Sequence, residues 1–300
     1  MAALAAAAYG TNPLFAINLY ADGMNPNSVC LFRYLLGLPI LALILLLRGR
    51  SLAIKREEIA PVAVLGIMMG ASSLTLFQSY NYINSGIAST LLFIYPVLVA
   101  LFMVFFFHER FKRVTGLCLC IMGVGLWMLM RTSGGESLDP FGVLLVMLSS
   151  LTYAVYLVMV NVSKRVGHIP TTKLLFYVLL FGSGVFLFMI PMGSELTMPV
   201  SVADWGNLLA LAVIPTIVSL FATTIAIQNI GSTSTAIFGA LEPVTALVLS
   251  VFALGQTITV RELWGAALIL VATTITVGAD NVDRYLLRVR KLFPKIRRKH

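Results

Sequence analysis

Ten apolar runs, each long enough to cross a bilayer, constrain this chain more than any other feature of its sequence. A helix rises 1.5 Å per residue, so a run of about 20 residues matches the hydrocarbon core of a membrane. Strands of a membrane β-barrel would instead alternate polar and apolar residues. We predict spans near 3–20, 28–47, 60–82, 86–107, 114–131, 140–162, 171–192, 204–227, 232–254 and 261–279. The predicted fold class is therefore all-α integral membrane, with ten transmembrane helices.

The composition leaves little room for anything else. Only 11% of the 300 residues are charged and mean hydropathy is +0.95, whereas an ordinary soluble domain is about 25% charged. Ten spans joined by short loops use almost the whole chain, so no separate soluble domain is expected. The net charge of +9 would suit nucleic acid, but the positions of the basic residues mark membrane topology instead. We expect the lipid bilayer, and no nucleic acid, as a partner.

Lysine and arginine alternate between the predicted loops. One set of loops and the tail hold most of the 21 basic residues: Arg48, Arg50, Lys55 and Arg56; Arg110, Lys112 and Arg113; Lys164, Arg165 and Lys173; and eight residues from Arg284 to Lys299. The opposite loops hold only Arg131 and Arg261. Because cytoplasmic loops carry the excess of basic residues, both termini are predicted to be cytoplasmic.

The chain also contains an internal repeat. Residues 88–109 resemble residues 235–256, and both segments place a Pro-Val pair at mid-span, at Pro96 and at Pro243. Proline removes a helix hydrogen bond, so both positions are predicted helix breaks. We divide the chain into repeats at 1–131 and 140–279, followed by a basic cytoplasmic tail at 280–300. Five spans per repeat is an odd number, so the repeats are inverted around a central cavity, an arrangement typical of alternating-access transporters.

Several motifs together resemble the EamA branch of the drug/metabolite transporter superfamily. They are Arg33 early in the second span, Tyr95-Pro96-Val97 with His108-Glu109-Arg110, and Glu242-Pro243-Val244 before Leu254-Gly255-Gln256. The resemblance implies a ten-helix secondary carrier, usually an exporter, whose cavity is lined largely by the first, third, fourth and matching later helices. The usual acid at the exit of the ninth span is Gln256 here, which puts any role of that acid in doubt. The short loops resemble bacterial members, which places the protein in an inner (cell) membrane.

Glu242 is the strongest candidate for a functional side chain. A lone carboxylate at mid-bilayer costs about 3 kcal/mol on insertion scales, and such groups usually face a cavity or the bundle interior. It is a candidate to bind a substrate ammonium or to carry a coupling proton. The alternative is a protonated or hydrogen-bonded glutamate that stabilises helix packing. Its repeat mate is Tyr95, so the two halves differ chemically at this point.

Polar and aromatic side chains on other spans are further candidates to line the cavity: Tyr9, Asn12, Gln78, Tyr80, Tyr153, Tyr156 and Thr224. On the first and sixth spans they occur as pairs three residues apart, which share a helix face. The alternative is that these groups join helices through hydrogen bonds. Arg33 is expected to snorkel to the outer surface rather than bind an anion. Gly66 and Gly70, four residues apart, predict a close-packing helix face.

We therefore expect a secondary active transporter that exports small amphipathic metabolites, such as amino acids or drug-like compounds, with protons as the coupling ion. A carrier of nucleotide sugars or phosphorylated metabolites is an alternative, although it would need intramembrane basic residues to meet phosphate. A passive channel or facilitator is another. No enzyme, catalytic residue, metal or cofactor is expected, since His108, His168 and His300 all fall at cytoplasmic edges or in the tail. The expected assembly is a monomer or a homodimer.

Overall fold

The structure is a computed structural model, and it describes residues 1–83, 85–108, 113–129, 139–254, 260–261, 263–272 and 274–275. In this part of the chain the regular structure is helical, without strands. The helices are α1 (Ala2–Tyr9), α2 (Asn12–Ala21), α3 (Pro26–Leu47), α4 (Arg56–Ser79), α5 (Ser85–Leu92), α6 (Tyr95–Phe107), α7 (Arg113–Leu129), α8 (Pro140–Val162), α9 (Lys164–Gly167), α10 (Thr171–Met189), α11 (Val202–Leu211), the π-helical stretch η1 (Ala212–Val218), α12 (Ser219–Gly239) and α13 (Leu241–Leu254).

Among the described residues, five helical stretches are long and apolar enough to cross a membrane. They are α3, α4, α8, α10 and the continuous path Val202–Gly239 formed by α11, η1 and α12. Shorter apolar helices cover Tyr95–Phe107, Val114–Met128 and Leu263–Ala272. An all-helical fold with several candidate membrane spans is thus confirmed, while ten spans in two inverted repeats stay a prediction. The predicted tail at 280–300 and the end of the tenth predicted span lie outside the described residues.

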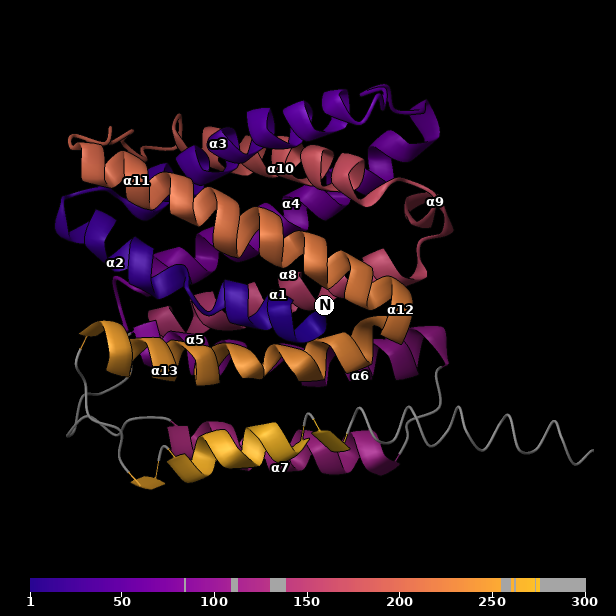
Figure 1. Cartoon of the computed structure of the whole chain (residues 1–300), viewed down its shortest axis with the longest axis vertical. Helices are drawn as coiled ribbons and strands as arrows, with labels where there is room; N and C mark the ends of the chain where they lie inside the picture. The colour runs from indigo at the N-terminus through magenta and orange to yellow at the C-terminus, as the bar shows by residue number, and fades with distance from the viewer. Residues whose placement is uncertain are drawn as a thin grey trace, which may run out of the picture.

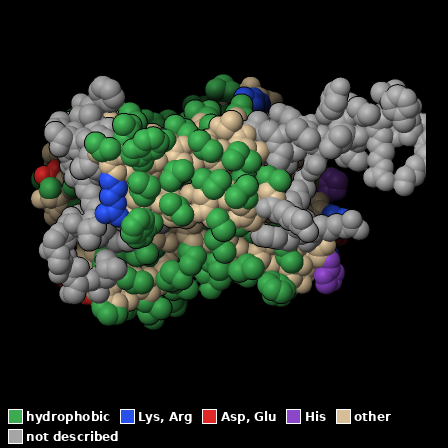
Figure 2. Space-filling model, turned by 90° about the horizontal axis from the view of Figure 1, so that it is seen from below, with side chains coloured by type: hydrophobic (Ala, Val, Ile, Leu, Met, Phe, Trp, Pro, Cys, Tyr) green, Lys and Arg blue, Asp and Glu red, His purple; other side chains and the backbone are tan. Residues whose placement is uncertain are grey.

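The surface of the bundle is apolar, as a lipid-facing surface requires. Phe105, Phe106 and Trp127 are among the large hydrophobic side chains left exposed. Figure 2 shows hydrophobic side chains over most of the middle of one face, with acidic side chains at one end and histidines at the other. Figure 1 shows α7 at one margin of the bundle and α1, α8 and α12 near the centre of the view. The visible acidic and histidine side chains therefore lie at the two ends of this face, and its apolar middle is suited to contact with lipid.

Three helical paths through the interior are interrupted near their centres. The first path is broken at Gly10 and Thr11, between α1 and α2. The second is broken between α5 and α6, and the third at Ala240, between α12 and α13. Pro96 is the second residue of α6 and Pro243 the third residue of α13. Proline is tolerated in the first turn of a helix, where its missing N–H would have no partner. Each of these prolines therefore lies where a new helix begins.

The long path Val202–Gly239 contains two irregularities with local causes. Pro215 lies in η1, where the hydroxyl of Thr216 donates to the carbonyl of Leu211 over 2.7 Å. Proline removes a backbone donor, and a π-turn is one way in which a helix accommodates the loss. Gly231 has φ of +80°, a conformation that costs glycine little. The path turns there, between the predicted spans 204–227 and 232–254.

The predicted close-packing face on α4 is confirmed. A Cβ atom added at Gly66 would lie 2.6 Å from the Cβ of Phe181, and one at Gly70 would lie 2.7 Å from the carbonyl oxygen of Gly182. The backbones of α4 and α10 therefore touch at these glycines. On the other side, the hydroxyls of Ser72 and Ser149 lie 3.0 Å apart and join α4 to α8. This central packing fixes the helices around the site described next.

Candidate functional site

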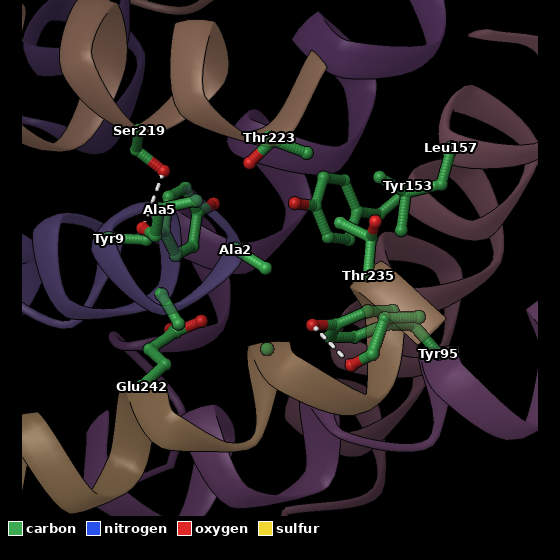
Figure 3. A pocket seen from close by; sticks show the side chains of 13 residues that line it. Ala2, Ala5, Tyr9, Tyr95, Tyr153, Leu157, Ser219, Thr223, Thr235 and Glu242 are labelled. Carbon is green, nitrogen blue, oxygen red and sulfur yellow. Dashed lines mark hydrogen bonds between the residues drawn. The ribbon is translucent and has the colours of Figure 1, made fainter. Parts of the chain in front are cut away.

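A small cavity lies in the interior where α1, α6, α8, α12 and α13 meet. Its volume is about 20 Å³, enough for about one water molecule. Figure 3 shows the side chains that converge on it. The residues that line it are Ala2, Ala5, Ala6, Tyr9, Tyr95, Tyr153, Leu157, Ser219, Thr223, Thr235, Ala236, Gly239 and Glu242. Among these residues, Glu242 carries the one ionisable carboxyl group, and none is Lys, Arg or His.

Glu242 is held by the start of α13. It is the second residue of that helix and is 7% exposed. The first turn of a helix carries partial positive charge, which favours a carboxylate there. Figure 3 shows its side chain directed to the cavity beside Tyr9. Behind it, a Cβ at Gly10 would lie only 2.7 Å from the carbonyl oxygen of Glu242, so α1 and α13 touch at this residue. The carboxyl group is thus accessible mainly through the cavity.

Four tyrosines form a connected aromatic cluster beside the carboxyl group. The rings of Tyr9 and Tyr153 are stacked with centroids 6.3 Å apart, and Tyr95 meets Tyr153 edge-on at 4.9 Å. Tyr153 also stacks on Tyr156 at 6.1 Å. Aromatic faces attract cations, particularly when water is excluded. A carboxylate next to these rings is an arrangement suited to an ammonium group or a proton.

The hydroxyl groups of the cavity wall bind mainly to backbone. Ser219 donates to the carbonyl of Ala5 over 2.9 Å, and Thr235 donates to that of Gly231 over 2.7 Å. Sequence reasoning missed both residues, because serine and threonine on helices usually bond to a carbonyl of their own helix, as Thr235 does, whereas Ser219 bonds across to α1. It also missed the alanines of α1. A usable signal was present, since Ala2, Ala5 and Ala6 share the helix face of Tyr9.

Four of the predicted cavity residues line this cavity: Glu242, Tyr95, Tyr9 and Tyr153. The other five do not. Tyr156 lies behind Tyr153, and the hydroxyl of Thr224 donates to the carbonyl of Leu220 over 2.8 Å. Tyr80 packs against Phe77, with ring centroids 5.6 Å apart. Gln78 lines a second pocket, and Asn12 binds Arg33.

Arg33 on α3 is buried, with 1% of its surface exposed. Its Nη1 donates to Oδ1 of Asn12 over 3.1 Å, and its Nη2 donates to Oγ of Ser73 over 2.9 Å. The guanidinium also lies 4.6 Å from the centre of the Phe77 ring. The expectation that Arg33 snorkels to the surface is wrong. Polar partners on α2 and α4, together with an aromatic face, hold it inside the bundle.

A second pocket of about 400 Å³ lies at the end of the bundle that we predict to be external. Its wall contains Asn25, Pro26, Asn27, Gln78, Asn81, Tyr82, Phe141, Ser194 and Glu195. An extended segment that follows α10 is attached beside it. Nδ2 of Asn25 donates to the carbonyl of Glu195 over 2.5 Å, and the N–H of Thr197 donates to Oγ of Ser28 over 2.9 Å. The pocket is polar and much larger than the inner cavity.

The candidate membrane spans of the bundle, together with the family match, define a multi-pass membrane protein of the transporter class. The chain belongs to the EamA-like transporter family, whose sequence model matches residues 1–131 and 140–278. The resemblance noted in the sequence is thereby confirmed.

Individual relatives agree with this assignment. The chain is 24% identical to an uncharacterized transporter, YdfC, of Bacillus subtilis (strain 168), over 81% of this chain and 79% of the relative. It is 27% identical to the pseudopaline exporter CntI of Pseudomonas aeruginosa (strain UCBPP-PA14), over 65% of this chain and 66% of the relative. An uncharacterized transporter of Archaeoglobus fulgidus is 28% identical over 91% of this chain and 93% of the relative. A solved crystal structure with 19% identity superimposes with a TM-score of 0.79, covering 95% of this chain and 97% of the other, and shares its fold.

Proposed function

We propose that this protein is a secondary active transporter that exports small amphipathic metabolites, such as amino acids or drug-like compounds, by alternating access. Family membership supports transport, and the pseudopaline exporter among its relatives supports export. The family model matches the chain in two separate stretches, 1–131 and 140–278. This division supports the two five-span repeats at 1–131 and 140–279.

The observation that carries the proposal is the position of Glu242. Its carboxyl group faces a small cavity, next to tyrosine rings, and the described wall of this cavity holds no basic residue. A carboxylate in such a place needs a cation or a proton to balance its charge. Substrate ammonium and proton therefore compete for one group, which is the simplest form of coupled exchange. We propose proton coupling through Glu242.

The interrupted helices supply a means of movement. The breaks at Gly10–Thr11, before Tyr95 and at Ala240 all flank the cavity. Discontinuous helices at the centre of a membrane are typical of transporters, in which one bundle moves against another around a fixed site. We propose that the half-helices on either side of these breaks open the cavity to the two sides of the membrane in turn.

The setting of this function is also proposed. Basic residues at one set of loops support cytoplasmic termini, and the short loops support a bacterial inner membrane. A phosphorylated-metabolite carrier is disfavoured, because the described cavity wall holds no Lys or Arg to meet a phosphate. A passive channel or facilitator would need no titratable group in the cavity, and Glu242 argues against it.

The test is uptake into proteoliposomes of radiolabelled amino acids and amines, with and without an acidic interior. Wild type is compared with Glu242→Gln, which keeps the shape of the side chain but cannot titrate. Wild type should accumulate a substrate when the interior is acidic. Glu242→Gln should lose accumulation yet still exchange labelled for unlabelled substrate.

The matched control is Glu57→Gln, since Glu57 is an exposed acid at the start of α4. This variant should accumulate substrate like wild type. If wild type and Glu242→Gln move the panel downhill equally whatever the gradient, Glu242 is structural and the protein is a facilitator. If no compound moves through wild type, the proposed substrate range is wrong.

A further inference from the structure

Arg33 is a buried cation whose partners do not neutralise it. In the described part of the chain, its hydrogen-bond and ring partners are Asn12, Ser73, Tyr34 and Phe77, none of which is acidic. A buried charge is normally paired, because removal from water is costly. Arginine cannot relieve that cost by losing its proton. Within the part of the chain that the structure describes, no acidic side chain therefore pairs with Arg33.

Unused donors remain at the same place. Among the described residues, the buried Nε of Arg33 finds no hydrogen-bond partner, and neither does Nδ2 of Asn12. A guanidinium offers five N–H donors in a fixed fork, and its two bonds to Asn12 and Ser73 use only part of them. Unsatisfied buried donors are rare and call for an explanation. Donors from two neighbouring side chains, both without partners, are the chemistry that receives an oxyanion.

The position of Arg33 is also well fixed. Its guanidinium lies 4.6 Å from the ring centre of Phe77 and 5.3 Å from that of Tyr34. Oγ of Ser73 binds both the guanidinium and the hydroxyl of Tyr34, each over 2.9 Å. A fork held in this way loses little conformational entropy when it binds a ligand. It is prepared for a planar partner such as a carboxylate.

The arginine and the cavity are linked through α1 and α2. Tyr9 lines the cavity beside Glu242, and Asn12, three residues later, binds Arg33. Arg33 and the cavity are therefore connected by neighbouring residues at the junction where α1 ends and α2 begins.

We propose that Arg33 and Asn12 form the anion-binding pole of a two-pole site whose cation-binding pole is Glu242, so that the substrate is a small zwitterion carrying a carboxylate and an ammonium group. This inference rests on the proposed transport function and narrows its substrate class. The burial, the two unpaired donors and the position of Tyr9 carry it.

A carboxylate fits the anion pole better than a phosphate. The fork of one guanidinium matches the two oxygens of a carboxylate. Within the described residues, the partners of Arg33 include no second Lys or Arg to balance a dianion. Glu242 would also repel a doubly negative headgroup. The site therefore selects an ammonium carboxylate over an ammonium phosphate.

The experiment uses the purified full-length protein in proteoliposomes. The labelled probe is the amino acid that wild type exchanges fastest, and its unlabelled competitors are the same amino acid, its methyl ester, its N-acetyl derivative and phosphoethanolamine. The ester lacks the carboxylate and the N-acetyl form lacks the ammonium. The variants are Arg33→Gln, Arg33→Lys, Asn12→Leu and Glu242→Gln, and the control is Arg48→Gln, which changes an exposed arginine.

Wild type and Arg48→Gln should prefer the amino acid to each derivative by about tenfold or more, the worth of a charge-assisted hydrogen bond. Arg33→Gln and Asn12→Leu should lose the preference over the methyl ester but keep the preference over the N-acetyl form. Glu242→Gln should lose the preference over the N-acetyl form but keep the preference over the methyl ester. Arg33→Lys should keep part of the preference over the ester, because it retains the charge but not the fork.

Equal competition by the amino acid and its ester in wild type would overturn the proposal, even if Arg33→Gln does not fold. The proposal would also be overturned if Arg33→Gln and Asn12→Leu, with unchanged thermal unfolding, kept the wild-type preference for the amino acid over its methyl ester. It would likewise be overturned if phosphoethanolamine competed more strongly than the amino acid in wild type. In these cases transport itself continues, so the proposed function stands. If wild type exchanges no amino acid at all, the proposed substrate range fails along with this inference.

Discussion

The hydroxyl of Tyr95 donates a hydrogen bond to the carbonyl of Ala236 over 3.3 Å, which ties the start of α6 to the last turn of α12. The same ring lies directly over Gly239, where an added Cβ would come within 1.6 Å of the Tyr95 hydroxyl oxygen. Tyr95 is buried, so its ring cannot move aside freely. Two interrupted helical paths from opposite halves of the sequence thus meet at one tyrosine and one glycine.

Gly239→Ala should therefore lower stability, because it forces the added methyl group against the Tyr95 ring. Overpacking of a core typically costs about 1–3 kcal/mol. Thermal unfolding in detergent measures the loss. The double variant Gly239→Ala with Tyr95→Phe should recover part of it, since the clashing oxygen is gone. A double variant no more stable than Gly239→Ala alone would show that the hydroxyl is not what limits the space.

The contact between α4 and α10 should be equally sensitive to side-chain size. Gly70→Val places two methyl groups where the carbonyl of Gly182 lies, so we expect a loss of at least about 1–3 kcal/mol. Gly184→Val is the control on α10, because a Cβ there meets nothing within 4 Å. It should change stability by no more than about 0.5 kcal/mol. Equal thermal unfolding midpoints for the two variants would contradict the close approach of these helices.

Asn25 should contribute to stability in two ways. Its side chain accepts a hydrogen bond from the N–H of Ser28 at the start of α3, and it donates to the carbonyl of Glu195. Asn25→Ala should cost about 1 kcal/mol as a lost helix cap, and limited proteolysis should then cut faster near residue 195. The control is Asn18→Ala, which removes an exposed amide that bonds only within its own helix. Similar cleavage of both variants would refute the tether.

The predicted topology can be tested by labelling. Glu195 and Arg48 are both exposed but lie in loops predicted to be on opposite sides of the membrane. The parent is Cys120→Ser, because Cys120 is the exposed native cysteine among the described residues. In intact cells, a membrane-impermeant maleimide should label Glu195→Cys and leave Arg48→Cys unlabelled until the cells are opened. The opposite pattern would place the termini outside.

The sequence predicted what depends on apolar length and on the cost of burying charge. The ends of α3, α4, α8 and α10 lie within about four residues of the predicted spans, a usual error for helix boundaries. Glu242 was found because a carboxylate inside an apolar run has few stable locations. Tyr95 was found through the internal repeat. These inferences need no knowledge of how the helices are placed against one another.

The remaining site residues depended on helix geometry that the sequence does not state. Tyr9 and Asn12 share a face only if one helix continues through both, but α1 ends at Tyr9 and α2 begins at Asn12. Asn12 therefore binds Arg33 while Tyr9 lines the cavity. Arg33 was expected to reach the surface, yet Ser73 and Phe77 of α4 hold it inside. Their positions follow from the packing of α3 on α4, which periodicity alone does not reveal.

The contact of Gly10 with Glu242 has a consequence for how this protein can vary. A Cβ at position 10 would also approach the Cβ of Thr245 to 3.2 Å. Any larger residue at this position would therefore increase the distance between α1 and α13. The gap would open beside the acid and admit solvent to a carboxyl group that is now shielded. Substitution at position 10 would thus alter the chemistry of residue 242 without touching its side chain. The small size of Gly10 thus limits the access of solvent to the carboxyl group of Glu242.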